Sequence, residues 1–199
     1  MKQDIKKEAI IQAAEKRFIH FTVAKTTMAE IAGDQGISKP LLYYYFPDKL
    51  ALYAAVISHV VERMQQSDGE ALKHSDPLKN IIAHLQRRKD FVMQYYNIIE
   101  FIKVAIDKAP EELKPFFQRV KTADFKAVRN IFEKGKKEKL LNIRDLDATT
   151  QLFLNCLDGL RYVLLQQDGV LVFPTKEQFD AVFAKEKEFA GIFVKGLQF

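Results

Sequence analysis

The chain has 199 residues, 48% of them hydrophobic, which suits one compact folded domain with a small appended one and excludes a disordered protein. No segment reaches the roughly 18 uninterrupted apolar residues of a membrane span, and the N-terminus lacks the apolar stretch of a signal peptide. We therefore expect a cytoplasmic protein with no membrane partner. The net charge of +5 suits nucleic acid, but residues 1–50 hold only eight Lys or Arg against six Asp or Glu, so charge alone does not identify DNA.

Apolar residues recur at intervals of three and four throughout the chain, which predicts an all-α fold. The first helix is expected over about residues 4–21. Its buried face carries four apolar side chains at helical spacing: Ile10, Ala14, Phe18 and Phe21.

The next segment predicts two short helices joined by a tight turn. Thr27 can cap the first helix while Glu30 reaches back to complete a capping box. Gly36 permits a positive φ in the turn, and Ser38 caps the second helix with Pro40 in its first turn. The short turn indicates a helix-turn-helix, in which the two helices close on each other through four core residues: Ile31, Ala32, Ile37 and Leu42.

The outer face of the second short helix is poor in acidic residues, and its N-terminus carries a partial positive charge. Such an end is suited to enter a major groove. Tyrosine hydroxyls donate to phosphate oxygens, and Lys49 adds a cation at the start of the following helix. These features predict double-stranded operator DNA as a partner.

One pattern in the first fifty residues is more specific than a helix-turn-helix alone. It consists of Phe18, Thr26-Thr27, Ile31-Ala32, Gly36-Ile37-Ser38, Leu42-Tyr43, Phe46 and Lys49. This pattern resembles the TetR family of bacterial transcriptional regulators. The resemblance implies an all-helical homodimer in which residues 1–47 form a helix-turn-helix DNA-binding domain and residues 48–199 form a helical ligand-binding and dimerisation domain.

The resemblance also implies site residues by matching position. The residues that would contact phosphates are Thr27, Ser38, Tyr43, Tyr44 and Lys49. Those nearest to bases would be Lys39, Pro40, Leu41 and Tyr45. The chain departs from the family at Thr22, where family members usually place Gly. Either the turn uses another geometry there, or Thr22 adopts a strained left-handed conformation at a cost of about 1 to 2 kcal/mol.

Five further helical segments are predicted after Phe46. One runs from Asp48 to about residue 67, and another starts at Asp76-Pro77. Pro110 and Pro115 lie in a predicted loop. The remaining helices are predicted over about residues 116–139, 147–167 and 175–196. We interpret the mixed-charge run 133–139, which contains a Gly, as a solvated helix end and loop.

Aromatic and apolar residues in the middle of the chain are numerous enough to line a cavity as well as a core. These are Phe91, Tyr95, Tyr96, Ile99, Phe101, Phe125 and Phe132. Such a row at helical spacing is more often ordinary packing, so the residues alone favour a core. The resemblance implies a pocket for an unidentified small-molecule effector.

The last two helices carry more apolar surface than one shared seam requires. We expect some of it to form a homodimer interface, which the resemblance places on these helices. The candidate interface residues are Phe153, Leu157, Leu160, Leu164, Phe183, Phe189 and Phe193. The alternative is that both faces are buried within one subunit.

The function expected is a ligand-responsive homodimeric repressor that releases its operator when a small molecule binds the C-terminal domain. An effector-free structural DNA-binding dimer is the alternative. An all-α enzyme using the aromatic cavity is less favoured, because the sequence has no Gly-rich phosphate loop, no serine elbow and no cysteine with a positioned histidine. The four histidines form no metal-ligand pattern, so we expect no metal and no cofactor.

Overall fold

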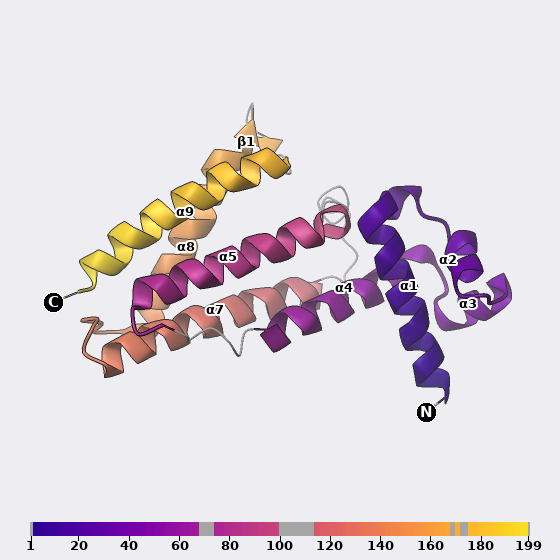
Figure 1. Ribbon diagram of the computed structural model, residues 1–199, viewed down its shortest axis with the longest axis horizontal. Helices are drawn as coiled ribbons and strands as arrows, with labels where there is room; N and C mark the ends of the chain where they lie inside the picture. Colours follow the sequence, from indigo (N-terminus) through magenta and orange to yellow (C-terminus); the bar gives the residue numbers. More distant parts are fainter. Residues whose placement is uncertain (1, 68–73, 100–113, 168–169, 172–174, 199) are drawn as a thin grey trace. The chain divides into compact units, whose positions relative to one another are not determined.

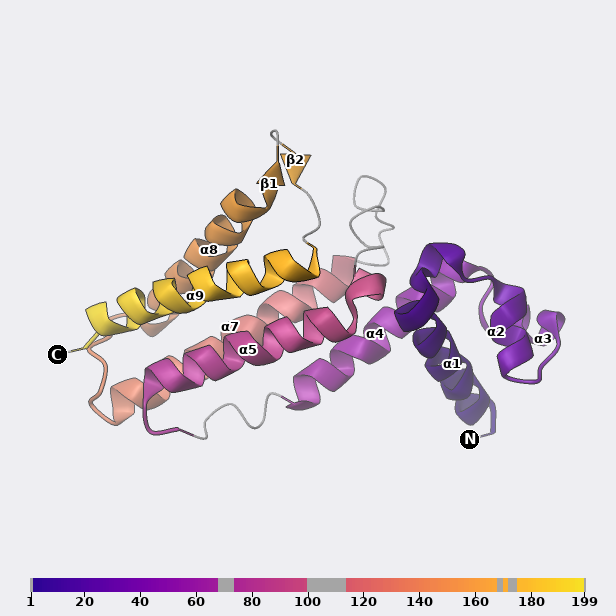
Figure 2. The ribbon, with the colours of Figure 1, turned by 45° about the horizontal axis from the view of Figure 1, so that its top comes forward.

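The all-α prediction is confirmed by the structure, a computed structural model that describes residues 2–67, 74–99, 114–167, 170–171 and 175–198 (Figure 1). Its helices are α1 (Lys2–Lys25), α2 (Met28–Asp34), α3 (Lys39–Tyr45), α4 (Lys49–Ser67), α5 (Pro77–Gln94), α7 (Lys114–Lys137), α8 (Leu146–Leu165) and α9 (Lys176–Gly196). The strands of the described residues are β1 (Gln166–Gln167) and β2 (Val170–Leu171), which pair antiparallel with Gln166 opposite Leu171 (Figure 2). Because β1 follows α8 directly, α8 ends two residues earlier than predicted.

The chain divides into two compact units. The first unit consists of Met1–Gln65 and Gln94–Gln118, and the second of Gln66–Met93 and Arg119–Phe199. We predicted a division after residue 47, whereas α4 lies in the first unit. The reason is its packing, since the buried Tyr53 of α4 meets the ring of Phe18 with centroids 6.1 Å apart.

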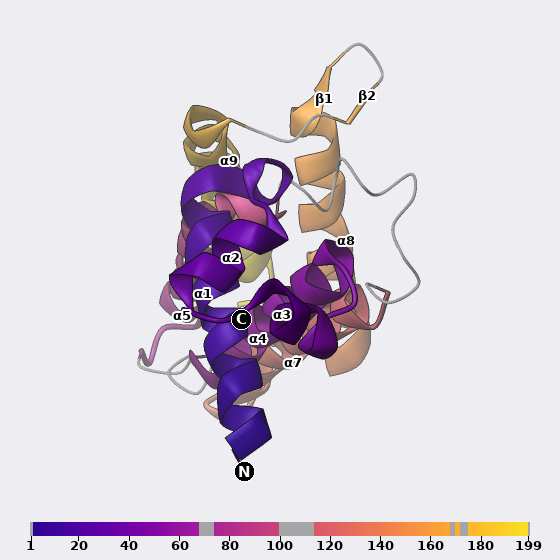
Figure 3. The same ribbon diagram turned by 90° about the vertical axis from the view of Figure 1, so that its right-hand side faces the viewer.

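The predicted helix starts in the first unit are confirmed. Thr27 Oγ1 accepts a hydrogen bond from the Glu30 N–H at 3.3 Å, and a Glu30 carboxylate oxygen accepts from the Thr27 N–H at 2.8 Å. Ser38 Oγ accepts from the Leu41 N–H, and Gly36 has φ 59°. The helix-turn-helix, which faces the viewer in Figure 3, is thus bounded by local hydrogen bonds.

Thr22 has φ 66° and ψ 158°, which interrupts the helical geometry of α1. The φ is positive, as one of the two expected alternatives requires, but the ψ lies outside the left-handed helical region. Phe21, which we predicted to be buried, is 56% exposed. The backbone change at Thr22 redirects the chain, and Val23 is buried in its place.

The core of the second unit is built from α5, α7, α8, α9 and the segment between α7 and α8. Aromatic rings form its centre, where Phe153 lies 5.5 Å from Phe132 and 5.1 Å from Phe193 between ring centroids. The fully or largely buried members are Ile81, Leu85, Val128, Ile131, Phe132, Leu141, Ile143, Phe153, Leu157, Phe183, Ala190 and Val194.

Gly135 belongs to this packing, although we predicted a solvated loop around it. The residue is buried inside α7, and a Cβ there would lie 2.7 Å from Leu141 Cδ1 and 3.0 Å from Pro77 Cγ. The glycine therefore lets the chain after α7 fold back against the helix.

Candidate nucleic-acid interface

The helix α3 has one face in the core and one face open to solvent. Leu42 is fully buried, and Phe46, which follows the helix, is 4% exposed. On the other face Tyr43 is 48% and Tyr44 is 70% exposed, so two consecutive aromatic residues with hydroxyl groups face solvent there. Ser38, Lys39 and Pro40 at the start of the helix are exposed as well, while Leu41 and Tyr45 are half-buried.

Thr27 and Ser38 differ in what their hydroxyls can still bind. The Thr27 hydroxyl already donates to Glu30 Oε2 at 2.8 Å, and the Thr27 N–H donates to the same oxygen. The Ser38 hydroxyl accepts from the Leu41 N–H, and its hydrogen has no acceptor within the described ranges. Ser38 is therefore free to donate to a phosphate oxygen, whereas Thr27 must first release Glu30.

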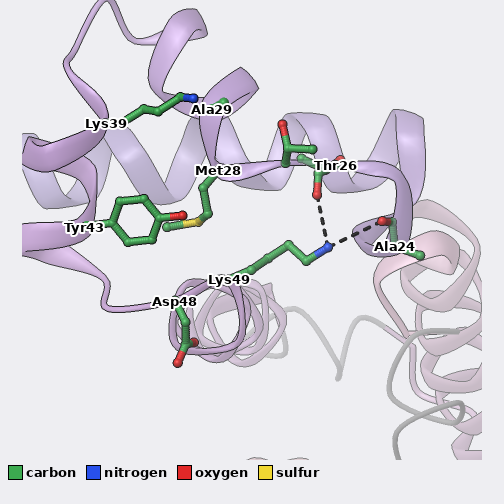
Figure 4. Close-up of a pocket in the computed structure, with 9 residues that line it drawn as sticks. Ala24, Thr26, Met28, Ala29, Lys39, Tyr43, Asp48 and Lys49 are labelled. Carbon is green, nitrogen blue, oxygen red and sulfur yellow. Dashed lines mark hydrogen bonds between the residues drawn. The ribbon is translucent and has the colours of Figure 1, made fainter.

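Lys49 is placed differently from the exposed phosphate ligand that we predicted. Its ammonium donates to the carbonyl oxygens of Val23 at 3.0 Å, Ala24 at 3.4 Å and Thr26 at 3.1 Å, two of which are drawn in Figure 4. An ammonium group has three hydrogens, so all of its donors are occupied. Lys49 fixes the start of α4 to the end of α1, a role that spacing alone does not reveal.

A pocket of about 380 Å³ opens between the end of α1, the start of α2 and α3 (Figure 4). It brings together four of the predicted DNA contacts, namely Thr27, Lys39, Tyr43 and Lys49. Met28 and Asp48, which we did not predict, also line it, and Tyr43 lies beside Met28. Asp48 is held by the N-terminus of α4, where its carboxylate accepts from the Ala51 N–H at 2.7 Å.

The acidic residues near α2 are paired within the unit. Arg17 of α1 donates to Asp34 Oδ1 at 3.0 Å and approaches Glu30 at 3.4 Å. The hydrogen bond from Arg17 lowers the pKa of Asp34, and the hydrogen bonds from Thr27 lower that of Glu30. Both carboxylates therefore stay ionised, and their charges are paired within the unit. The helix α3, which carries Lys39, contains no acidic residue.

The predicted ligand-pocket residues are divided between the units. Tyr95, Tyr96 and Ile99 lie in the first unit, and Phe91, Phe125 and Phe132 lie in the second. Phe132 is fully buried against other rings in the core of the second unit. Phe101 lies outside the described residues.

Most of the predicted interface residues on α8 and α9 are in the core of the second unit. Phe153, Leu157 and Phe183 are buried there, and Phe189 and Phe193 are half-buried against the same core. All five side chains therefore contribute to packing within one subunit, because the aromatic face of α9 packs on α7 and α8. Leu160 is half-buried, and Leu164 is 41% exposed.

Other aliphatic side chains remain exposed on these helices, and we call this set the α8–α9 apolar face. Its members are Leu152 (56% exposed), Val163 (70%) and Ile192 (69%), with the exposed Gly159 on α8 between the first two. Leu152, Gly159 and Val163 follow each other at intervals of seven and four residues, which places them on one side of a helix. That spacing is visible in the sequence, so this side of α8 could have been predicted.

Among the described residues, no helix has the length and apolar composition that a membrane span requires.

Comparisons with known proteins agree with this geometry. Residues 10–56 match the family described as bacterial regulatory proteins, tetR family. The chain is similar to the HTH-type transcriptional regulator RutR of Escherichia coli K12, with 44% identity over 57 residues that cover 29% of this chain and 27% of RutR. It is also 31% identical over 91 residues to the HTH-type transcriptional activator FasR of Mycolicibacterium smegmatis, covering 45% and 42% of the two chains. These matches span about a quarter and under half of the relatives' length.

A solved structure extends the similarity to the whole fold. A transcriptional regulator from Cytophaga hutchinsonii superposes with a TM-score of 0.82 at 28% sequence identity, covering 98% of this chain and 99% of the other. The likeness therefore includes the second unit as well as the helix-turn-helix.

Proposed function

Because the chain belongs to the TetR family of bacterial regulatory proteins, we propose that it is a transcriptional regulator that binds operator DNA through α3. The observation that carries this proposal is the exposed face of α3. Tyr43 and Tyr44 project from it above a buried Leu42, and the N-terminus of the helix is free of acidic residues. Such a surface is suited to a major groove flanked by phosphates.

The proposed contacts differ in kind along α3. Ser38, Tyr43 and Tyr44 donate hydrogen bonds to phosphates, which position the helix. The residues next to bases are Lys39, Pro40, Leu41 and Tyr45. Pro40 and Leu41 offer only apolar contacts, so part of the sequence preference comes from thymine methyl groups and DNA shape.

Thr27 and Lys49 act on the DNA indirectly in this proposal. The hydrogen-bond donors of both residues are already occupied within the first unit, where they hold the start of α2 and the start of α4 in place. They thereby set the orientation of α3 without themselves reaching a phosphate. This assignment revises the direct contacts implied by the sequence pattern.

We propose further that the protein works as a homodimer joined through the α8–α9 apolar face. Leu152 and Val163 are exposed on one side of α8 and Ile192 is exposed on α9, and exposed aliphatic side chains of this size favour burial against a second copy. Apart from the adjoining backbone of α8 itself, no atom of the described chain lies within 4 Å of a Cβ placed on Gly159, so another helix can approach there. Two copies related by a twofold axis would present two α3 helices to a palindromic operator.

The regulator is proposed to be a ligand-responsive repressor. Repression needs only that the bound dimer occupies the promoter, whereas activation needs an additional surface that recruits the polymerase. A small molecule that binds one dimer geometry better than the other would release the operator by shifting the population. Because FasR is named an activator, a reporter gene behind the operator tests the sign. Repression predicts higher expression when the gene for this protein is deleted, and lower expression would contradict it.

The DNA proposal is tested by fluorescence anisotropy with DNA from upstream of the protein's own gene and of its neighbours. Tyr43→Phe removes one phosphate donor and should weaken binding to every sequence alike, by about fivefold for a hydrogen bond of about 1 kcal/mol. Tyr162→Phe removes the same atom from an exposed tyrosine of α8 and should leave the affinity unchanged. Equal affinities for wild type and Tyr43→Phe would remove Tyr43 from the interface, and binding without sequence preference or salt dependence would contradict the function.

A further inference from the structure

We propose that Arg87, together with His84, forms the anion-binding end of a ligand site in the second unit, and that the ligand carries a carboxylate. This inference rests on the proposed response to a small molecule and adds the chemical class of that molecule. Both residues lie on α5. They are three positions apart and therefore share one side of the helix.

Arg87 is half-buried, and two nitrogens of its guanidinium are enclosed without a counter-ion among the described residues. Its Nε and Nη2 atoms are shielded from solvent and have no hydrogen-bond partner among the described residues. By contrast, Arg88 of α5 pairs with Asp124, and Arg161 of α8 pairs with Glu186 and Asp158. A buried charge with unsatisfied donors destabilises a protein unless an ion or ligand completes it.

The buried carboxylate of α7 is already engaged. Asp124 of α7 pairs with Arg88, and its Oδ1 lies 3.5 Å from His84 Nε2. Burial acts to raise the pKa of Asp124, but the charge of Arg88 and the nearby His84 hold it below its ordinary value. Asp124 is therefore ionised and committed to Arg88, and it leaves Arg87 to pair with a group from outside the chain.

The two unpartnered atoms of Arg87 also determine which anion fits. Nε and Nη2 lie on the same edge of the planar guanidinium, so their N–H bonds are nearly parallel. Two parallel donors match the two oxygens of one carboxylate in a bidentate pair. A point charge such as chloride would satisfy only one of them well.

His84 and Phe91 complete the proposed site along α5. His84 is 4% exposed; its Nε2 faces Asp124 Oδ1 at 3.5 Å, whereas its Nδ1 has no partner among the described residues and is the ring nitrogen left for a ligand. Phe91 stands one turn after Arg87 on the same side of the helix and supplies an apolar neighbour. The ligand class is thus a small carboxylate with an apolar body.

The test compares the thermal unfolding of the full-length wild type and of Arg87→Met. Benzoate and hexanoate are the probes, benzamide and hexanamide are their uncharged analogues, and sodium chloride keeps the ionic strength equal. A carboxylate that occupies the site at about 100 times its Kd should raise the wild-type Tm by about 5 °C or more, while its amide should not.

Arg87→Met keeps the length of the side chain but removes the buried charge. We expect its Tm without ligand to be equal to or above that of the wild type, and we expect the carboxylate response to be lost. Arg144→Met, at an exposed position of the same unit, should keep the full response. A structural role for Arg87 would instead lower the Tm of the variant without ligand.

Three results would overturn the inference: an equal carboxylate response in Arg87→Met and wild type, no response of the wild type to either carboxylate, or a response to inorganic phosphate alone. The response of the operator complex is measured separately by anisotropy. If carboxylates raise the Tm through Arg87 but never release DNA, the site stands and the ligand-responsive mechanism fails. If Arg87→Met still binds the operator while carboxylates have no effect on either protein, the site fails and the DNA-binding function stands.

Discussion

The helix-turn-helix and the second unit differ in the range of the contacts that define them. In the helix-turn-helix, Thr27 and Ser38 cap their helices through residues only three positions away. In the second unit, rings from α7, α8 and α9 meet in one aromatic cluster, in which Phe132 and Phe153 lie 21 positions apart along the chain. Local contacts thus define the proposed DNA-binding surface, while long-range packing defines the larger body. The difference predicts which substitutions act on the whole protein and which act on one helix.

The largest effect is expected for Phe153→Ala. Phe153 has no exposed surface, and its ring touches Phe189 and Phe193 as well as Phe132. Truncation of a buried phenylalanine to alanine lowers the free energy of unfolding by about 3 to 5 kcal/mol, because it removes apolar contacts and leaves a cavity. Urea unfolding followed by circular dichroism measures the loss. Leu140→Ala, at a partly exposed leucine, is the control, and an equal loss there would contradict the central place of the aromatic cluster.

Asp124→Asn should have the next largest effect, about 2 kcal/mol, because it leaves Arg88 without its carboxylate in a partly buried site. The folded protein holds the pKa of Asp124 below its ordinary value. The stabilisation is therefore complete above the unfolded pKa of about 4 and is lost as the pH falls through the folded value.

The pH dependence separates this charge effect from a packing effect. Wild type and Asp124→Asn should differ in stability at pH 7 and should converge as the pH falls below about 4. Unfolding curves at a series of pH values show the convergence. A difference that stays constant down to pH 2 would show that the carboxylate charge is not responsible.

Replacement of glycine by alanine should change the free energy of unfolding in opposite directions in the two regions. In α7 the new methyl group meets Leu141, so the free energy of unfolding should fall by about 1 to 2 kcal/mol. In α2, Gly33 has no atom of the described chain within 4 Å of its Cβ position, so Gly33→Ala should raise stability by up to about 1 kcal/mol. Thermal unfolding of both variants tests the contrast, and a stabilised Gly135→Ala would refute the close packing.

Thr22→Gly should have the smallest effect, a gain of about 0.5 to 1 kcal/mol. Glycine adopts the observed φ of 66° without steric cost, but it also increases the entropy of the unfolded chain. The gain is measured as a rise in Tm. Thr22→Ala retains the Cβ and should give no such gain, and a Thr22→Gly variant less stable than wild type would argue against strain at this residue.

Features set by neighbouring residues were predictable from the sequence. The capping boxes at Thr27 and Thr175, the positive φ of Gly36 and the start of α5 after Asp76 all follow from short-range chemistry. For the same reason, the exposure of Ser38, Lys39, Pro40, Tyr43 and Tyr44 on α3 could be predicted, whereas Leu41 and Tyr45 are half-buried.

Features set by distant contacts were not predictable. Lys49 meets carbonyl oxygens 23 to 26 positions away, and Gly135 is buried because the chain after α7 folds back on it. Helical spacing shows that Phe153 and Leu157 lie on an apolar face, but it does not say whether that face meets its own subunit or another. Only the packing of α9 on α8 shows that these residues are in the core.

The most direct test of DNA recognition by α3 is a DNase I footprint on the region upstream of the protein's gene. A dimer that presents two α3 helices predicts two protected half-sites about one helical turn apart, related by a palindrome, with protection that weakens as the salt concentration rises. Lys39→Ala should weaken the protection of both half-sites together. Uniform protection, or an unchanged footprint with Lys39→Ala and Tyr43→Phe combined, would contradict DNA recognition by this helix.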